Sequence, residues 1–242
     1  MSIPKIIHYC WLSNDSLPSL AIDCIATWKS VLSDYEFILW DLRKFDINST
    51  VWTKEAFQYK KYAFAADYIR CYALYNYGGI YLDTDVEVKR TFNPFLVNDY
   101  MLGRENPALI EAAVIGAKPK SDLFKKMLKF YECRHFDLGK GKFDMTPLPL
   151  IMEKVIKENY NIKIISDISN YSENPNTISI FEDDFFSPKS CQDGKIYETK
   201  NTISIHHYNQ SWQSPWRKYG RKIVLVLGGV AMKNKLKKLI FR

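Results

Sequence analysis

The stretch from Ala63 to Val88, AFAADYIRCYALYNYGGIYLDTDVEV, limits the possible folds of this 242-residue chain more than any other. Its first half is apolar and aromatic on nearly every side of a helix, which predicts a helix packed inside a domain. The pair Gly78–Gly79 predicts the end of that helix, because glycine readily takes the left-handed conformation found there. A short apolar strand over Ile80–Leu82 follows. The stretch therefore predicts a helix, a turn and a buried strand.

Four ionisable side chains belong to the same stretch. Asp67 and Arg70 are three residues apart, which places them on one face of the helix. Asp83 and Asp85 follow the strand, and an extended chain would turn both of them, together with Tyr81, to one side. Open α/β sheets bind ligands at the carboxyl ends of their strands. We therefore expect the chemistry of the protein at this point.

The first 40 residues favour a parallel sheet. Residues 3–9 form an apolar run with one Lys, residues 18–32 have the pattern of a helix, and residues 35–40 (YEFILW) form a second apolar run. This β-α-β order predicts parallel strands joined by a right-handed crossover. We predict an α/β domain over residues 1–220, with a mixed, mostly parallel sheet flanked by helices.

The later part of the chain predicts further elements. Strands are expected at 100–104, 162–165, 177–181 and 202–205, and helices at 121–131 and 150–159. Residues 108–117 (ALIEAAVIGA) fit either a helix or a strand, because the periodicity of a short apolar run does not decide between them. Residues 181–188 are acidic and aromatic, and we expect a loop there.

The positive charge of the chain is concentrated at its C-terminal end. Of the 34 basic residues, nine lie between Arg217 and Arg242, where there is no acid, so the rest carries 25 basic and 27 acidic groups. The excess therefore does not indicate nucleic-acid binding by the domain. Apolar residues recur at helical spacing between the lysines of residues 221–242. We predict a basic amphipathic helix on an anionic membrane surface, and the alternative is a helix docked on the domain.

The cysteines and the N-terminus indicate a cytoplasmic protein, and the predicted tail helix would place it peripherally at the inner face of the membrane. The five cysteines are widely spaced and include no C-x-x-C pair, which favours a reducing compartment over a disulfide framework or a zinc site. The N-terminal residues lack the pattern of a signal peptide. No apolar stretch reaches the roughly 18 residues expected of a transmembrane helix.

Residues at two other strand ends could complete a site. Trp11 follows the first predicted strand, where it either stacks on a flat ring or packs in the core. His206 and His207 follow the strand predicted at 202–205 and open the segment HHYNQSW. Two adjacent histidines, in a chain that also has Asp-x-Asp, favour a metal or phosphate site over two structural histidines.

The Asp-x-Asp pair is suited to a divalent cation. Two carboxylates at a strand end can hold Mg²⁺ or Mn²⁺ while a diphosphate fills other coordination positions, and the ion then neutralises charge on a leaving phosphate. Arg70 could contact the same phosphates or a sugar hydroxyl through its forked guanidinium, and Asp67 could accept hydrogen bonds from sugar hydroxyls. The alternative for these two residues is an ion pair on the helix surface with little effect.

The residues AADYIRCYALYNYGGIYLDTDVEV resemble the A-x-D-x-x-R…GG-x-Y-x-D-x-D signature of DXD-containing retaining glycosyltransferases. The resemblance is to the sugar-binding-region family, which includes homologues of the yeast initiating α-1,6-mannosyltransferase and bacterial capsular polysaccharide synthesis transferases. Its core is shared with the clostridial glucosylating toxins. The opening IPKIIHYCWLS is similar to the first strand of that family, and HHYNQSW to its H-H-x-x-x-S-W ending. The resemblance implies a GT-A-type nucleotide-sugar-binding domain.

The resemblance also implies residues that bind the donor. It places Trp11 against the base of the nucleotide, and it places His8 and Tyr81 among the donor-binding residues. Ser211 and Trp212 match neighbours of the phosphates.

Four residues match the catalytic constellation of the family. Asp67 and Arg70 match contacts to the donor sugar and the phosphates, and they also count among the donor-binding residues. Asp83 matches the acid that contacts ribose, sugar and metal, and Asp85 matches the principal metal ligand.

The implied protein is a metal-dependent retaining glycosyltransferase. It would move a hexose or N-acetylhexosamine from a nucleotide sugar, UDP-linked, to a saccharide or lipid-linked oligosaccharide acceptor in surface polysaccharide synthesis, with Mn²⁺ or Mg²⁺ as the cation. For the further metal ligand we prefer His207, with His206 as the alternative. The sequence identifies no carboxylate as a covalent nucleophile, so we expect the acceptor to attack the sugar on the face that the diphosphate leaves.

Two other functions fit parts of the same pattern. IYLDTDV also resembles the nucleophile motif of haloacid-dehalogenase-type phosphatases, with Asp83 as the nucleophile and the pair Asp183–Asp184 as metal-binding acids. That motif normally opens its domain, whereas here it follows 80 residues that contain a complete β-α-β unit. The other alternative is a membrane-associated glycan-binding protein without catalysis, against which the intact metal and donor residues argue.

Overall fold

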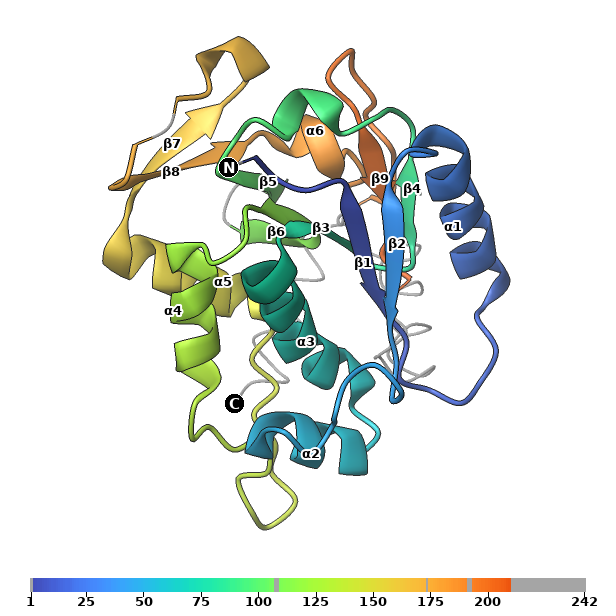
Figure 1. The fold of residues 1–242 in the computed structure, drawn as a ribbon, viewed down its shortest axis with the longest axis vertical. Helices are drawn as coiled ribbons and strands as arrows, with labels where there is room; N and C mark the ends of the chain where they lie inside the picture. Colours follow the sequence, from blue (N-terminus) through green and yellow to red (C-terminus); the bar gives the residue numbers. More distant parts are fainter. Residues whose placement is uncertain (1, 107–108, 173, 191–192, 210–242) are drawn as a thin grey trace.

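A seven-stranded sheet forms the centre of the molecule, in the strand order β2-β1-β3-β6-β5-β8-β7 (Figure 1). The structure is a computed structural model and describes residues 2–106, 109–172, 174–190 and 193–209. The strands are β1 (Ile6–Cys10), β2 (Glu36–Trp40), β3 (Gly79–Leu82), β4 (Val86–Val88), β5 (Tyr100–Asn106), β6 (Leu109–Ala117), β7 (Asn161–Ile165), β8 (Thr177–Phe181) and β9 (Ser204–His206). The helices are α1 (Ser19–Val31), α2 (Val51–Gln58), α3 (Tyr62–Tyr77), η1 (Asn93–Phe95), α4 (Asp122–Tyr131), α5 (Leu148–Asn159), η2 (Ile168–Asn170) and α6 (Asp183–Phe186).

The sheet is mixed and mostly parallel, which confirms the predicted fold class. β1 pairs in parallel with both β2 and β3, and β8 pairs in parallel with both β5 and β7. The antiparallel strand β6 joins the two blocks through β3 and β5. Because the chain passes from β1 to β2 on one side and later returns to β3 on the other, the end of β1 is a topological switch point, where such sheets bind ligands.

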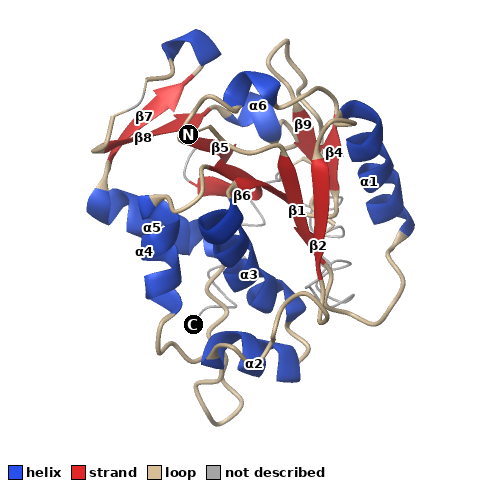
Figure 2. Ribbon diagram, in the orientation of Figure 1, coloured by secondary structure: helices blue, strands red, loops and turns tan. Residues whose placement is uncertain are grey.

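Helices cover both faces of the sheet (Figure 2). Side chains of α2, α3, α4 and α5 fill one apolar cluster, whereas α1, β4 and α6 contribute to the cluster on the other face. The inward residues of α1 are spaced three or four apart, which is the period of a helix buried on one side: Ala21, Cys24, Ile25 and Trp28. The predicted β-α-β unit is therefore confirmed.

Helix α3 is the predicted central helix, and it ends where the two glycines stand. Gly78 has φ +65°, and a Cβ at this position would lie 2.6 Å from Pro119 and 2.9 Å from Pro4. No other residue would fit there without displacing backbone or a proline ring. The close approach of the chain at Gly78 sets the direction in which β3 leaves the helix.

The structure differs from the sequence-based expectations at several elements. Residues 108–117, which fitted helix or strand, contain strand β6, and the loop expected at 181–188 contains the short helix α6. The extended conformation does not continue through Asp83 and Asp85, because the Val86 amide donates to the Asp83 carbonyl (3.1 Å) and closes a turn. The turn directs the chain into β4, which pairs with β9 in a separate two-stranded sheet.

The part of the chain that the structure describes contains no helix both long enough and apolar enough to cross a bilayer. The predicted tail, residues 221–242, lies outside the described residues, so its membrane-surface helix stays a prediction.

Candidate active site

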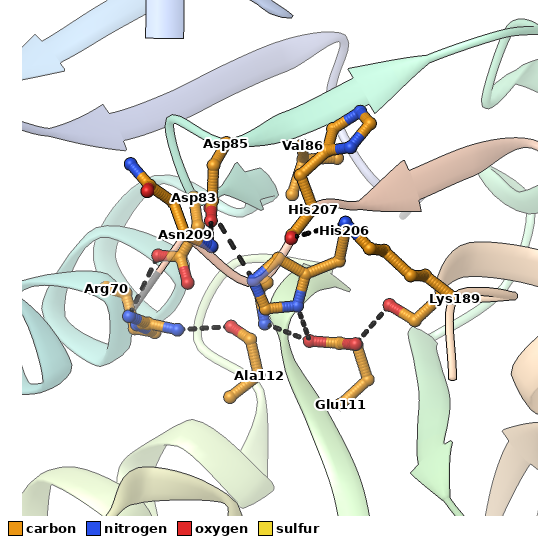
Figure 3. Close-up of polar contacts among 12 residues, drawn as sticks. Arg70, Asp83, Asp85, Val86, Glu111, Ala112, Lys189, His206, His207 and Asn209 are labelled. Atoms are coloured by element: carbon orange, nitrogen blue, oxygen red, sulfur yellow. Dashed lines mark hydrogen bonds and ion pairs between the residues drawn. The ribbon is translucent and has the colours of Figure 1, made fainter. Parts of the chain in front are cut away.

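Three potential metal ligands converge at the end of β3. Asp83 and Asp85 come from the turn between β3 and β4, and His206 comes from the end of β9. One ligand atom of each lies within 4.8 Å of the others (Figure 3). The pairing of Val86 with His206 in the small sheet brings the histidine beside residues 120 positions earlier in the chain. Two carboxylate oxygens and one imidazole nitrogen form a donor set that fits a divalent cation such as Mn²⁺ or Mg²⁺.

Asp85 also holds the chain that follows β9. Its carbonyl accepts from the His207 amide (3.0 Å), its Oδ2 accepts from the Asn209 amide (2.7 Å), and its Oδ1 lies 3.5 Å from Nε2 of His206. Burial raises the pKa of Asp85, but the hydrogen bond and the charge of His206 outweigh burial and lower this pKa to about 2. Asp85 is therefore an anion at neutral pH, as a metal ligand must be.

His206, and not His207, belongs to this group, which corrects our preference for His207. The imidazole of His207 points away from the carboxylate pair, and its Nε2 lies 3.1 Å from Oε2 of Glu87 (Figure 3). Consecutive side chains at the end of a strand point to opposite sides, so only one of two adjacent histidines can face the site. Sequence reasoning could not choose between them, because the choice depends on the pairing of β4 with β9.

Arg70 is buried at the centre of the acidic residues. Its Nη2 lies 3.1 Å from Oδ1 of Asp83 and 3.3 Å from Oδ1 of Asp67, and its Nη1 donates to the carbonyl of Ala112. Its guanidinium carbon lies 4.5 Å from the centre of the Tyr81 ring. Only 6% of the Arg70 side chain is exposed, so the surface ion pair that we considered as an alternative is wrong.

The carboxyl of Asp67 is buried beside Arg70. Burial raises its pKa to about 7, with Arg70 opposing the rise and Asp83 adding to it. Burial also raises the pKa of Asp83, against the charge of Arg70. A single guanidinium thus lies between two carboxyls whose pKa values are both raised, and such shifted pKa values are common at functional sites.

Two predicted donor-binding residues lie in the core instead of at the site. His8 is fully buried: its Nε2 lies 2.7 Å from the carbonyl of Gly78, and its Nδ1 accepts from Nε1 of Trp40 at 3.1 Å. Burial lowers the pKa of His8 to about 4, so it is a neutral residue whose two nitrogens are both in use. Tyr81 is 1% exposed and lies against Arg70. Neither side chain is accessible to a nucleotide in this structure.

Trp11 lines a pocket of about 250 Å³ that opens to solvent. The pocket is formed by residues 11–14, after β1, and by Leu39 and residues 41–43, at the end of β2. Trp11 is partly exposed, and its Nε1 donates to the carbonyl of Asp15 at 2.9 Å, which fixes the plane of the indole. The alternative of a core tryptophan is therefore excluded, and the ring is free to stack on a flat ligand.

The other predicted residues are either outside the described chain or away from the site. Ser211 and Trp212 lie outside the described residues. Asp183 and Asp184, the metal-binding acids of the phosphatase hypothesis, lie in α6, and the Asp184 carboxylate accepts from Thr199 (2.7 Å) and Asn201 (3.1 Å). They are not part of the group around Asp83, so the structure does not support the phosphatase interpretation.

Sequence reasoning missed Glu111. This side chain is 1% exposed, and its Oε1 lies 3.5 Å from Nδ1 of His206. The available signal was its place in the sequence, because it is the only charged residue in the apolar strand β6 (LIEAAVIGA). A lone buried carboxylate needs a partner, and this one lies next to the candidate metal site.

Comparison with known proteins agrees with this geometry. Residues 18–102 match the family model of the glycosyltransferase sugar-binding region containing DXD motif. The match covers about a third of the chain, and we call these residues the sugar-binding region after the family model that they match. The match includes Asp67, Arg70, Asp83 and Asp85, and it confirms the resemblance seen in the sequence. Trp11 and His206 lie outside the sugar-binding region and are brought to it by the fold.

Curated yeast proteins are similar to about half of the chain. Inositol phosphoceramide mannosyltransferase 3 of Schizosaccharomyces pombe is 36% identical over 121 residues, which cover 48% of this chain and 33% of that protein. Mannosyl phosphorylinositol ceramide synthase SUR1 of Saccharomyces cerevisiae is 31% identical over 139 residues, covering 56% of this chain and 36% of that protein. The aligned residues thus span about a third of the length of these relatives.

A solved structure has the same fold. The PaToxG glycosyltransferase aligns with a TM-score of 0.53 at 18% identity, over 65% of this chain and 70% of that chain. This similarity supports the predicted GT-A-type architecture around the sugar-binding region.

Proposed function

We propose that this chain is a metal-dependent glycosyltransferase that moves a hexose from a nucleotide sugar to a polar lipid or lipid-linked glycan. The observation that carries the proposal is the convergence of Asp83, Asp85 and His206 beside the buried Asp67–Arg70 pair, in a chain whose sugar-binding region matches glycosyltransferases. The names of the yeast relatives make mannose the first sugar to test and an inositol phospholipid the first acceptor.

The three convergent ligands would hold Mn²⁺ or Mg²⁺. Such an ion supplies Lewis-acid catalysis, since it neutralises the charge that develops on a departing nucleoside diphosphate. Asp85, with its low pKa, is ready to bind a cation, whereas Asp83 is shared with Arg70. The requirement for two ionised carboxylates makes cation binding weaker as the pH falls.

The pocket beside Trp11 suits the base of the donor. β1 and β3 are parallel neighbours, so the residues after β1 and the Asp-x-Asp turn after β3 emerge at the same edge of the sheet. A base stacked on Trp11 would leave its diphosphate directed toward the cation site. A UDP-linked donor stays our prediction, and the pocket lining of Ser13, Asn14 and Arg43 offers polar groups to a base.

The sugar would lie near the Asp67–Arg70 pair. The carboxyl of Asp67, with a pKa of about 7, can accept from or donate to a sugar hydroxyl. Glu111 and Asp67 are both buried, so neither is presented as a covalent nucleophile. We therefore propose transfer with retention, in which the acceptor hydroxyl attacks the face that the diphosphate leaves while the diphosphate oxygen accepts its proton.

A screen of nucleotide sugars tests this function. UDP- and GDP-linked hexoses and N-acetylhexosamines are added with Mn²⁺ to the wild type and to Asp85→Ala, and thermal stabilisation and slow donor hydrolysis are measured. We expect one base and one sugar to stabilise the wild type alone. If no nucleotide sugar binds the wild type better than Asp85→Ala, the proposal is wrong.

Membrane association belongs to the same proposal. A basic tail at residues 221–242 would hold the enzyme on the anionic cytoplasmic face of a membrane, next to a lipid acceptor and, in the sequence-based hypothesis, to surface polysaccharide synthesis. Co-sedimentation with phosphatidylserine vesicles, with and without residues 221–242, tests this part. Equal sedimentation of the two chains would refute it.

A further inference from the structure

Strand β6 is irregular at the point where it passes the candidate active site. Between the pairs Leu102–Ile115 and Arg104–Ile110, β5 advances by two residues while β6 advances by five. Three extra residues therefore form a bulge in β6. Bulges next to active sites change the direction of side chains that a regular strand would point elsewhere.

The bulge contacts residues of the candidate active site through two backbone carbonyls and holds the side chain of Glu111. The carbonyl of Ala112 accepts from Arg70, and the carbonyl of Ala113 accepts from the amide of Asp83 at 2.9 Å. The Ala113 amide donates to Oε1 of Glu111 at 2.6 Å. The same irregular segment thus positions the arginine, the first aspartate of the motif and the carboxylate of Glu111.

Glu111 faces the far side of the His206 ring. Its Oε1 lies 3.5 Å from Nδ1 of His206, while Nε2 of the same ring lies 3.5 Å from Oδ1 of Asp85 (Figure 3). Its other oxygen, Oε2, accepts from the hydroxyl of Ser187. The imidazole therefore lies between two carboxylates, with one nitrogen toward the cation ligands and the other toward Glu111.

We infer that Glu111 is a positioning residue that fixes His206 with Nε2 directed at the cation site and with the ring proton on Nδ1. The inference rests on the proposed function, because it assigns the orientation of a ligand in that site. Histidines that bind metals almost always donate their other N–H to a carboxylate or carbonyl, which sets the tautomer and makes the ligating nitrogen more basic.

Two observations favour this assignment over a purely structural one. Nδ1 of His206 is buried and makes no aligned hydrogen bond within the described residues, and the facing acceptor is Glu111. Glu111 is itself outside the group of converging ligand atoms, and its two oxygens are held by Ser187 and by the Ala113 amide. Glu111 thus acts on the cation through His206 and not as a ligand.

The test compares two carboxylates that each face one of the adjacent histidines. Glu111→Gln removes the charge beside His206, and Glu87→Gln removes the charge beside His207, where the two side chains are 3.1 Å apart. Mn²⁺ binding to the full chain is titrated by electron paramagnetic resonance. We expect Glu111→Gln to weaken Mn²⁺ binding about 10- to 100-fold, the usual cost of losing such a partner, and Glu87→Gln to leave it unchanged.

A second measurement reports the orientation directly. The ¹⁵N shifts of the His206 ring are recorded with Mg²⁺ bound, and we expect one tautomer with the proton on Nδ1 in the wild type and a mixture in Glu111→Gln. Ser187→Ala, a milder change, should weaken Mn²⁺ binding a few-fold by loosening Glu111, and it decides the case if Glu111→Gln does not fold.

The outcomes separate this inference from the proposed function. The inference is overturned if Glu111→Gln binds Mn²⁺ with wild-type affinity and keeps the wild-type tautomer. If Glu111→Gln does not fold, wild-type Mn²⁺ affinity in Ser187→Ala overturns it. The proposed metal site then still stands if Asp85→Ala has lost Mn²⁺ binding. If the wild type binds Mn²⁺ no better than Asp85→Ala, the proposed function fails, and the role of Glu111 fails with it.

Discussion

His8 and His206 show how differently this fold surrounds the same type of residue. His8 lies between the Gly78 carbonyl and the Trp40 indole, two neutral partners that occupy both of its ring nitrogens. His206 lies between the carboxylates of Asp85 and Glu111, and its pKa is raised well above the ordinary value because these charges outweigh the effect of burial. For His8, burial lowers the pKa to about 4.

The comparison separates a structural polar group from a site. Both ring nitrogens of His8 have a hydrogen-bond partner, and neither partner is charged, so no ion or ligand is needed to balance this imidazole. Around His206 and Arg70, four buried or partly buried carboxylates share two cationic side chains (the carboxylates are Asp67, Asp83, Asp85 and Glu111). A divalent cation would reduce this negative excess, which is why we assign the function to this region.

The largest effect is expected when a ligand of the cation is removed. Asp85→Ala should lower the rate of sugar transfer by about 10²- to 10³-fold, since it removes a ligand of the cation that stabilises the leaving diphosphate. Initial rates with saturating donor and Mn²⁺ measure this loss. Transfer within a factor of two of the wild type would break the assignment of the site.

The adjacent histidines provide a matched pair for the next effect. His206→Ala should weaken Mn²⁺ binding by about 10- to 100-fold, whereas His207→Ala, which removes only the contact to Glu87, should change it less than two-fold. Isothermal titration of both variants makes the comparison. Equal losses in the two variants would mean that the structure has selected the wrong histidine.

The same comparison between a site residue and a core residue can be made with two tryptophans, Trp11 at the pocket and Trp40 in the core. Trp11→Ala should raise the KM for the nucleotide sugar about tenfold, because stacking on a base is worth about 1–3 kcal/mol, and it should hardly change stability. Trp40→Phe, which removes the donor to His8, should lower stability and leave the KM unchanged. A Trp11 variant with an unaltered KM would exclude the proposed base pocket.

The smallest effect concerns pH and the neutral histidine. The pKa of His8 is about 4 when folded and about 6.5 when unfolded, so between these values the unfolded chain binds more protons. The stability from neutral His8 is complete above pH 6.5 and is lost as the pH falls toward 4, a change of about 3 kcal/mol.

His8→Gln should flatten this dependence of the unfolding free energy on pH. It should also cost about 1–2 kcal/mol at pH 7, because the flexible amide does not hold the Gly78 and Trp40 partners in the geometry of the ring, without changing Mn²⁺ binding. Urea unfolding at several pH values measures both effects. An identical pH slope in the variant would show that His8 does not titrate as described.

The sequence was sufficient for the parts of the site that are local in the chain. The helical spacing of Asp67 and Arg70 predicted that these side chains meet, and the glycine stop at Gly78 located the turn into β3. The position of Asp83 and Asp85 after β3 was also predicted, but a turn at Asp83, and not an extended chain, places them at the site. Such predictions rest on periodicities that neighbouring residues impose on each other.

The rest of the site depends on pairings between distant segments. His206 faces the carboxylates because β9 pairs with β4, and Glu111 reaches His206 because β6 bulges against β5. Neither pairing leaves a periodic pattern in a short apolar run, so the ALIEAAVIGA stretch looked like a helix or a strand without a site residue. The resemblance also placed His8 among the donor-binding residues, whereas both of its hydrogen-bond partners lie in the core.

The most direct test of the central claim is the stoichiometry of Mn²⁺ binding in the wild type and in the double variant Asp83→Asn/Asp85→Asn, measured by electron paramagnetic resonance with and without a nucleoside diphosphate. Our account predicts one Mn²⁺ per wild-type chain, bound more tightly when the diphosphate is present, and loss of this ion in the double variant. Equal binding by the two chains, unaffected by the diphosphate, would contradict it.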